Sequence, residues 1–157
     1  MASAFRIREA HGADLEAIAK LYVQLKRHHR KLQPGNPRYR VSDAEWREVA
    51  RRAIATEDIA MRVAELDGAI IGFAKMTLEQ KPWGISCEVD TMVVDGRHRN
   101  RGVGARLLEA AEQYAKSAGA KGIRVDVLLA NHEGRAFYER EGYEPFAVRY
   151  GKALPSD

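Results

Sequence analysis

A glycine-containing segment between an apolar run and an amphipathic stretch is the part of the sequence best suited to bind a ligand. It reads Arg99-Asn100-Arg101-Gly102-Val103-Gly104. The two glycines would let the backbone approach a ligand closely, and the free N–H groups of a following helix would point at the same place. Arg97 and His98 add positive charge. The segment predicts an anion site that would suit a pyrophosphate, although it lacks the Gly-Lys-Ser/Thr of a P-loop and has Leu107 where a Rossmann fingerprint has its third glycine.

A second pattern follows the first along the chain. It consists of Asn131, the aromatic pair Phe137-Tyr138, and Gly142-Tyr143. Together with Arg99, Gly102 and Gly104, these residues resemble the two signatures of the GCN5-related N-acetyltransferase (GNAT) superfamily. The first signature is Arg or Gln, any two residues, Gly, any residue, and then Gly or Ala. The second is an Asn at the start of the next helix, followed several residues later by an aromatic residue and Tyr. Short glycine patterns arise by chance, whereas two signatures in the right order and at a typical separation are specific.

The resemblance implies an acyl-coenzyme A site, with acetyl-CoA as the acyl donor. Backbone amides of Arg99, Asn100, Arg101, Gly102, Val103 and Gly104 would hold the pyrophosphate. The pantetheine arm would lie where the strand ending at Met92, Val93 and Val94 separates from the strand after Ile123, and Asn131 would contact it. No Cys/His pair has the spacing of metal ligands, so we expect no metal site.

The reaction implied by the resemblance is transfer of the acetyl group to a primary amine. An alkylammonium must lose a proton before its nitrogen attacks a thioester, and Glu88 stands about where some relatives place their base. Asp90 is the alternative, and both carboxylates could instead pair with arginines across the sheet. Because strand side chains alternate, we expect Glu88 and Asp90 on the same face as Met92 and Val94. Cys87 falls on the other face from Glu88, which argues against a covalent acyl-cysteine route.

The remaining catalytic groups are also carried over from the resemblance. A backbone N–H near Met92 or Val93 would stabilise the oxyanion of the tetrahedral intermediate. Tyr138 would protonate the departing thiolate, although it could also simply pack beside Phe137. Direct attack of the amine within a ternary complex is the expected mechanism.

Local signals predict the elements of the first half of the chain. The expected elements are a strand at 5–7, a helix from residue 14, a helix over 42–54 and two strands over 60–66 and 69–77. Asp14 can cap the first helix, and Ser42 and Glu45 have capping-box spacing for the second. Asp67-Gly68 favours a type I′ turn, so the two strands should form a hairpin.

The second half alternates strands with helices. The expected elements are a strand at 85–94, a helix from about 102 to 119, a strand at 123–129, a short helix between 131 and 142, and a last strand at 143–150. Helices between strands permit parallel pairing, whereas hairpins are antiparallel. We therefore predict an α/β fold with a GNAT-like mixed central sheet, antiparallel and then parallel, flanked by helices. The length of the chain predicts a single domain over residues 1–157, and the resemblance implies that it is an acetyltransferase domain.

Composition excludes several classes of protein. The chain has 26 Lys and Arg, 22 Asp and Glu, a net charge of +4, and 45% hydrophobic residues. These values are typical of a globular domain and not of a disordered or membrane protein. The single cysteine excludes an internal disulfide, and the first nine residues lack the apolar run of a signal peptide. We therefore expect a cytoplasmic protein.

Other functions stay open from the sequence. One is a non-catalytic acyl-CoA-binding module or sensor. Another is a nucleic-acid-binding domain that uses the basic stretches 97–101 and 27–31, which we do not favour because aromatic platforms and a continuous basic face are not evident. The acceptor is either a small molecule or a protein, and Glu88 and Asp90 would favour a cationic amine. Many members of the superfamily are dimers, which makes a homodimer an option.

Overall fold

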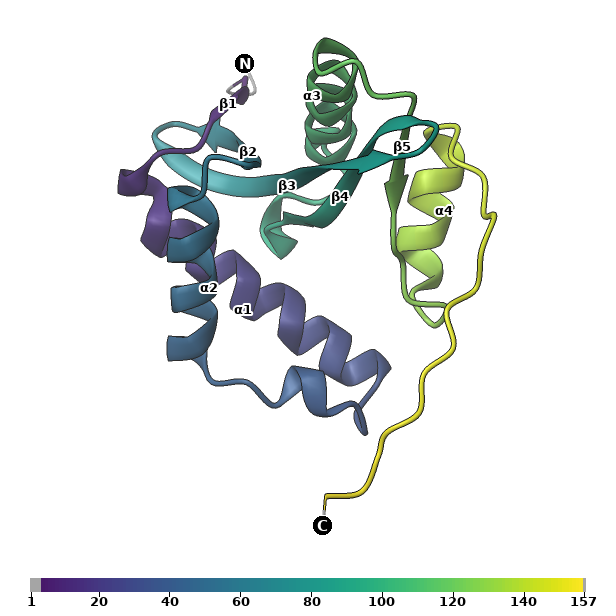
Figure 1. Ribbon diagram of the computed structural model, residues 1–157. Helices are drawn as coiled ribbons and strands as arrows, with labels where there is room; N and C mark the ends of the chain where they lie inside the picture. Colours follow the sequence, from purple (N-terminus) through teal and green to yellow (C-terminus); the bar gives the residue numbers. More distant parts are fainter. Residues whose placement is uncertain (1–3, 157) are drawn as a thin grey trace.

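The computed structural model describes residues 4–156, which build a five-stranded sheet between layers of helices (Figure 1). The strands are β1 (Arg6–Glu9), β2 (Ile59–Leu66), β3 (Ala69–Lys81), β4 (Gly84–Val94) and β5 (Gly122–Val125). They lie in chain order, antiparallel from β1 to β4, with β5 parallel to β4. The α-helices are α1 (Leu15–Leu32), α2 (Asp43–Ala55), α3 (Val103–Ser117) and α4 (His132–Arg140). The predicted mixed α/β fold is confirmed.

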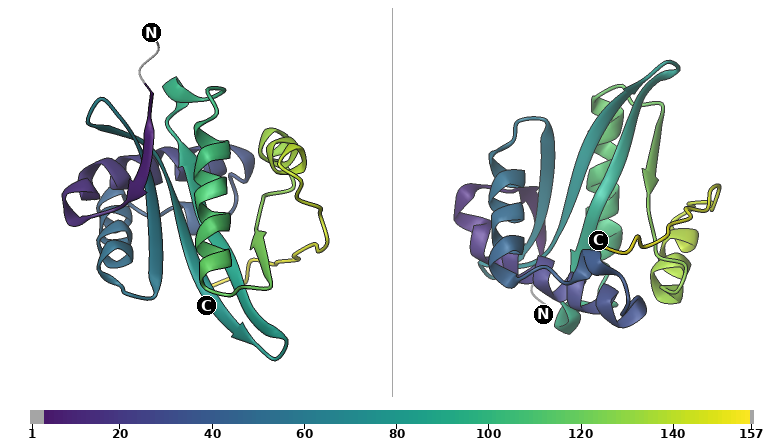
Figure 2. Two further views of the ribbon diagram at one scale, coloured as in Figure 1. Left: turned by 90° about the horizontal axis from the view of Figure 1, so that it is seen from above. Right: turned by 60° about the horizontal axis from the view of Figure 1, so that its bottom comes forward.

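The two faces of the sheet bury separate apolar clusters. Helices α1 and α2 cover one face and α3 covers the other, as Figure 2 shows. On the α1 face, the Tyr22 ring lies 4.9 Å from the Phe73 ring, and both side chains are fully buried. On the α3 face, Leu107 and Met76 are equally buried. Helix α4 lies beside β5 and has no buried residue, so it is the most weakly packed helix of the fold (Figure 1).

Most of the local predictions are confirmed. Asp67 and Gly68 have φ angles of 50° and 81°, as a type I′ turn requires. The Ser42 backbone N–H donates to Glu45 Oε2 (2.8 Å) and the Glu45 N–H donates to Ser42 Oγ (3.3 Å), which is the predicted capping box. Gly119 ends α3 with a φ of 74°. Short sequence signals were therefore sufficient wherever the structure depends on neighbouring residues alone.

Asp14 does not cap α1 as predicted. Its carboxylate accepts bonds from Arg8 Nη1 (2.8 Å) and Nη2 (2.9 Å) and from the His11 backbone N–H (2.8 Å). The preceding single-turn helix η1 (Gly12–Asp14) turns the side chain back toward β1. A bidentate guanidinium is a stronger partner than a backbone amide, so Asp14 ties β1 to the start of α1.

The end of the chain differs from the prediction. Strand β5 ends at Val125 instead of continuing to 129, and residues 143–150 form no strand. Phe146, Val148 and Tyr150 alternate as in a strand but are exposed, and Arg149 Nη2 makes an ion pair with Asp126 Oδ2 (2.5 Å) beside β5. An alternating pattern fits a half-buried surface and does not by itself supply the neighbouring strand that a ladder needs.

Candidate functional site

Strand β4 carries a bulge in the middle of the sheet. Lys75 of β3 pairs with Thr91 and Met76 pairs with Val89, so Asp90 is an extra residue with no partner in the register. A bulge shifts the side-chain alternation of its strand by one position. Before the bulge, odd-numbered residues of β4 point to one face of the sheet, and after it, even-numbered residues point to that same face.

This shift corrects the prediction that Glu88 and Asp90 share a face with Met92 and Val94. Val89 packs in the cluster beneath α3, as do Met92 and Val94, whereas Val93 packs in the cluster beneath α1 and α2. Glu88 consequently lies on the α1 face, opposite Met92 and Val94. Asp90 is on the α1 face as well, because its carboxylate makes an ion pair with Lys75 there. Cys87 lies opposite Glu88, as expected, and is buried beneath α3.

The bulge also marks the point at which β4 and β5 part. Their parallel pairing runs from Ser86–Gly122 to Val89–Val125 and goes no further. From Thr91 to Val94, β4 is paired with β3. Its other edge has no strand beside it in the described part of the chain. Main-chain groups on an open edge can bind an extended ligand in the way that a neighbouring strand would.

The loop after β4 is held in place from two sides. The Asp95 N–H donates to Ile71 O of β3 (2.8 Å), and the Gly96 N–H donates to Gln24 Oε1 of α1 (3.1 Å). The Asp95 carboxylate accepts a bond from the Arg97 backbone N–H (2.9 Å) and makes an ion pair with the Arg97 guanidinium. These contacts lower the pKa of Asp95 to about 2. The loop begins in a fixed position, with its carboxylate already paired.

The rest of the loop fits an anion. Asn100 and Gly102 have positive φ angles of 59° and 78°, and a side chain at Gly102 would meet nothing within 4 Å. Gly102 is the N-cap of α3, and no side chain caps that helix. The first N–H groups of α3 therefore have no side chain capping them, and they lie next to Val94 at the end of β4. Such a helix start attracts negative charge through its exposed amides and its dipole.

Two glycines fix the position of α4, one where it packs against the start of α3 and one at its own N-terminal cap. An added Cβ at Gly104 would lie 3.3 Å from the Phe137 ring, so a larger residue there would push α4 away. Asn131 Oδ1 accepts the Gly134 N–H (3.0 Å), which is the predicted cap of α4. At Gly134 an added Cβ would lie 2.5 Å from Asn131 Nδ2. Small residues thus fix Asn131 and the aromatic pair beside the loop.

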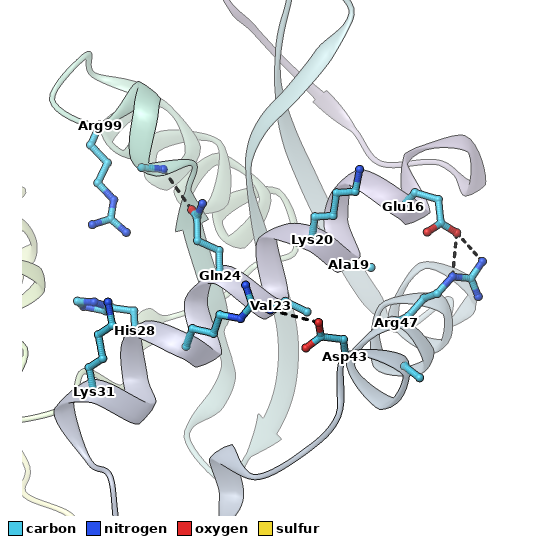
Figure 3. Close-up of a pocket in the computed structure, with 13 residues that line it drawn as sticks. Glu16, Ala19, Lys20, Val23, Gln24, His28, Lys31, Asp43, Arg47 and Arg99 are labelled. Carbon is cyan, nitrogen blue, oxygen red and sulfur yellow. Dashed lines mark hydrogen bonds and ion pairs between the residues drawn. The ribbon is translucent and has the colours of Figure 1, made fainter.

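A basic groove runs along α1 next to this loop (Figure 3). It has a volume of about 810 Å³ and is lined by one stripe of α1, the start of α2, Gly96 and Arg99. Arg27 and Arg47 are paired with Asp43 and Glu16. No carboxylate in the described chain lies within ion-pair distance of Lys20, Lys31 or Arg99. In Figure 3, Arg99 extends toward His28 and Lys31, so the positive charge of the loop continues onto α1.

The two candidate bases both have cationic partners. Glu88 Oε2 accepts from Arg124 Nη2 (3.2 Å) of β5, and the same guanidinium donates to Glu79 (2.6 Å). Asp90 Oδ2 lies 3.8 Å from Lys75 Nζ. The cross-sheet pairing considered from the sequence is therefore present, with a lysine in one case. The ion pair of Asp90 is longer than that of Glu88, and Asp90 lies where the pairing of β4 with β5 ends.

Tyr138 lies on α4 in an apolar setting. Its ring centroid is 5.0 Å from that of Phe137 and 5.8 Å from that of Tyr143. Burial raises the pKa of the Tyr138 phenol well above its ordinary value. The phenol is therefore protonated throughout the neutral range and can act as a proton donor. Packing and an acid role are compatible for this residue.

Lys26 is a further cationic residue near the site, and it was not predicted from the sequence. Lys26 of α1 places its ammonium 4.9 Å from the centroid of the Trp46 ring and 6.0 Å from that of Tyr39, which belongs to the single-turn helix η2 (Pro37–Tyr39). Burial, followed by the charges of Arg38 and Lys75, lowers the pKa of Lys26 to about 8. One signal was available, because Lys26 follows the core residue Tyr22 by one helical turn and so points inward.

Among residues 4–156, no three His, Cys, Asp or Glu side chains come together as a metal site would require. Within the same range, no helix is long and apolar enough to cross a bilayer.

Comparison with known proteins gives consistent matches. The model of the acetyltransferase (GNAT) family matches residues 18–143. An uncharacterized N-acetyltransferase of Bacillus subtilis, YhfO, is 30% identical over 141 residues, which cover 88% of this chain and 89% of that protein. The L-amino acid N-acetyltransferase AaaT of Escherichia coli is 29% identical over 153 residues, which cover 93% and 90%. Both relatives match over most of their length.

The fold also matches that of solved acetyltransferases. The aminoglycoside N-acetyltransferase AAC(6')-Iy, crystallised with CoA, superposes with a TM-score of 0.74 at 20% identity and covers 98% of each chain. At this identity, the likeness supports the fold alone.

Proposed function

Because the chain belongs to the acetyltransferase (GNAT) family, we propose that it transfers an acetyl group from acetyl-CoA to a primary amine by direct attack in a ternary complex. The observation that carries this proposal is the junction of the open β4 edge with the uncapped start of α3. An extended arm ending in a pyrophosphate needs both features side by side. The family match and the N-acetyltransferase relatives support the same donor. We further propose that residues 1–157 act as one domain, of which 1–3 and 157 lie outside the described residues.

The proposed donor contacts follow from the geometry of the loop. Backbone amides from Arg99 to Gly104 bind the pyrophosphate, and Arg99 adds charge. The pantetheine arm lies along Met92, Val93 and Val94. Because Asn131 Oδ1 is engaged by Gly134, its Nδ2 is the group that donates to the pantetheine arm.

The proposed reaction uses groups on both sides of β4. The amine nitrogen loses a proton to a carboxylate, directly or through water, and attacks the thioester carbon to form a C–N bond. A β4 N–H near Met92 or Val93 stabilises the oxyanion. The C–S bond then breaks, Tyr138 protonates the departing thiolate, and the nitrogen loses its second proton, which returns Tyr138 to its neutral form. Glu88 and Asp90 are the two candidate bases on the α1 face. The products are the acetamide and free CoA.

The first test is binding of acetyl-CoA. Isothermal calorimetry should give saturable one-to-one binding to the wild-type protein and none to Gly102→Glu, which sets a carboxylate where the pyrophosphate is expected. Gly119→Glu is the matched control, because Gly119 has a similar φ of 74° and equally open surroundings at the other end of α3. Equal loss of binding in both variants, or no binding by the folded wild type, would contradict the proposed donor site.

The second test is turnover. Thiol release in the presence of a panel of amines should detect acetyl transfer, and mass spectrometry should find the acetamide. Tight binding of acetyl-CoA with transfer to none of the amines would favour the acyl-CoA sensor instead.

A further inference from the structure

The α1 face of the sheet holds more positive charge beside the bulge than its own carboxylates balance. The positive charges of Arg38 and Lys75 act on Lys26 there, and Asp90 is the carboxylate paired with Lys75. No carboxylate among residues 4–156 lies within 4 Å of Lys26. A half-buried ammonium without a counterion is costly, and the aromatic rings of Trp46 and Tyr39 offset only part of that cost.

His29 adds to the same surroundings. It lies one turn after Lys26, and its ring centroid is 5.5 Å from that of Tyr39. Burial, with the charges of Lys26, His28 and Arg38, lowers the pKa of His29 to about 4. The imidazole is therefore neutral at pH 7 and adds no positive charge.

This cationic group adjoins the proposed reaction centre. Lys75 pairs in register with Thr91, the residue that follows the bulge, and reaches Asp90 itself. The side chain of Lys75 is 18% exposed and that of Asp90 is 26% exposed, so both are accessible to a small molecule. The negative charge of Asp90 lies where the pairing of β4 with β5 ends. The positive charges of Lys26 and Arg38 lie on other elements, α1 and η2.

Building on the proposed function, we propose that the acceptor is a small amine that also carries an acidic group, and that Lys26 binds this group with help from Arg38 and Lys75. The amine end then faces Asp90 and the open edge of β4. The acidic group is a carboxylate or a phosphonate, since either would supply the missing negative charge. This narrows the expectation from the sequence that Glu88 and Asp90 favour a cationic amine, because both carboxylates already have cationic partners.

Matched acceptors test the proposal by activity. The common L-amino acids, β-alanine and 2-aminoethylphosphonate are each assayed beside the amine that lacks the acidic group, with kanamycin as a polyamine. We expect kcat/KM to be at least about 10-fold higher for the best acidic acceptor than for its neutral counterpart, which is about 1.4 kcal/mol. Equal or higher efficiency with the neutral amines or kanamycin would overturn the inference and leave the proposed acetyl transfer intact.

Variants of Lys26 identify the group responsible. Lys26→Met keeps the aliphatic stem over the rings and removes the charge, so the preference should fall to within about 3-fold, through KM, with acetyl-CoA binding unchanged. Lys26→Arg should keep most of the preference. Lys116→Met, on the last turn of α3, is the control and should change nothing. A preference that survives Lys26→Met would refute the assigned role.

A binding measurement keeps the inference testable without turnover. In Trp83→Phe, which removes the exposed second tryptophan, Trp46 is the remaining fluorophore and lies under the Lys26 ammonium. Titration with the acidic amines in the presence of CoA should change its emission with saturation, whereas ethylamine should not. If no amine is acetylated and this titration still saturates, the proposed reaction fails and the acid-binding site stands. An absent or equal response to both ligand types would overturn the site.

Discussion

Replacing Tyr138 by phenylalanine tests the proposed acid with little disturbance of the fold. The substitution keeps the ring and its contacts with Phe137 and Tyr143 and removes only the hydroxyl group. Because burial raises the phenol's pKa above its ordinary value, about 99% or more of it is protonated at pH 8 in the wild type. Tyr138→Phe therefore removes a proton donor that is available in nearly every wild-type molecule. We expect kcat to fall by about 10²- to 10⁴-fold, which raises the barrier by about 3–5 kcal/mol.

The assay separates this loss from other effects. Thiol release gives kcat, calorimetry gives the affinity for acetyl-CoA, and thermal unfolding gives stability. We expect kcat to fall, the affinity to change by less than about 3-fold, and the stability to stay the same. Tyr114→Phe is the control, because burial also raises the pKa of the Tyr114 phenol, whose ring lies under Arg62 on the other side of α3. A Tyr138→Phe enzyme with kcat within 3-fold of the wild type would refute the reasoning.

Three further predictions concern the remaining ionisable groups. Arg8 lowers the pKa of Asp14, so this contact stabilises the fold above about pH 4 and its contribution is lost as the pH falls; Asp14→Asn should cost about 3 kcal/mol at pH 7 in urea unfolding and show a smaller loss in acid. Burial raises the pKa of Cys87 to about 11, so a thiol reagent at pH 8 should label it only as the protein unfolds, and faster labelling would contradict the buried site. If the base is Glu88, Glu88→Gln should lower kcat by at least about 100-fold and Asp90→Asn much less, whereas the reverse result would assign the base to Asp90.

The parts of the fold that depend on neighbouring residues were predictable. The hairpin turn at Asp67-Gly68, the capping box of α2 and the cap of α4 at Asn131 each depend on contacts within a few residues. The loop before α3 belongs to the same class, since a glycine with positive φ and a helix start are both local features. The loop and Asn131 belong to the proposed donor site, which explains why short motifs could indicate it.

The parts that depend on distant pairing were not predictable. A strand pattern at 143–150 was evident, but no local signal says whether another strand lies beside it. The bulge at Asp90 likewise arises from the register between β3 and β4, and a simple alternation through β4 placed Glu88 on the wrong face. Lys26 was overlooked because its surroundings come from α2, η2 and β3, which are far apart in the sequence.

The bulge connects these findings. By shifting the alternation of β4, it puts Met92 and Val94 under α3 on the proposed donor side, while Asp90 and Thr91 both face α1. The same extra residue stands where β4 loses its pairing with β5, so the edge opens beside the charged group on α1. A strand with unbroken alternation would have kept Asp90 on the side of Glu88 but turned Thr91 toward α3. One inserted residue therefore explains both the open edge proposed for the pantetheine arm and the position of Asp90, which the amine end of the acceptor is proposed to face.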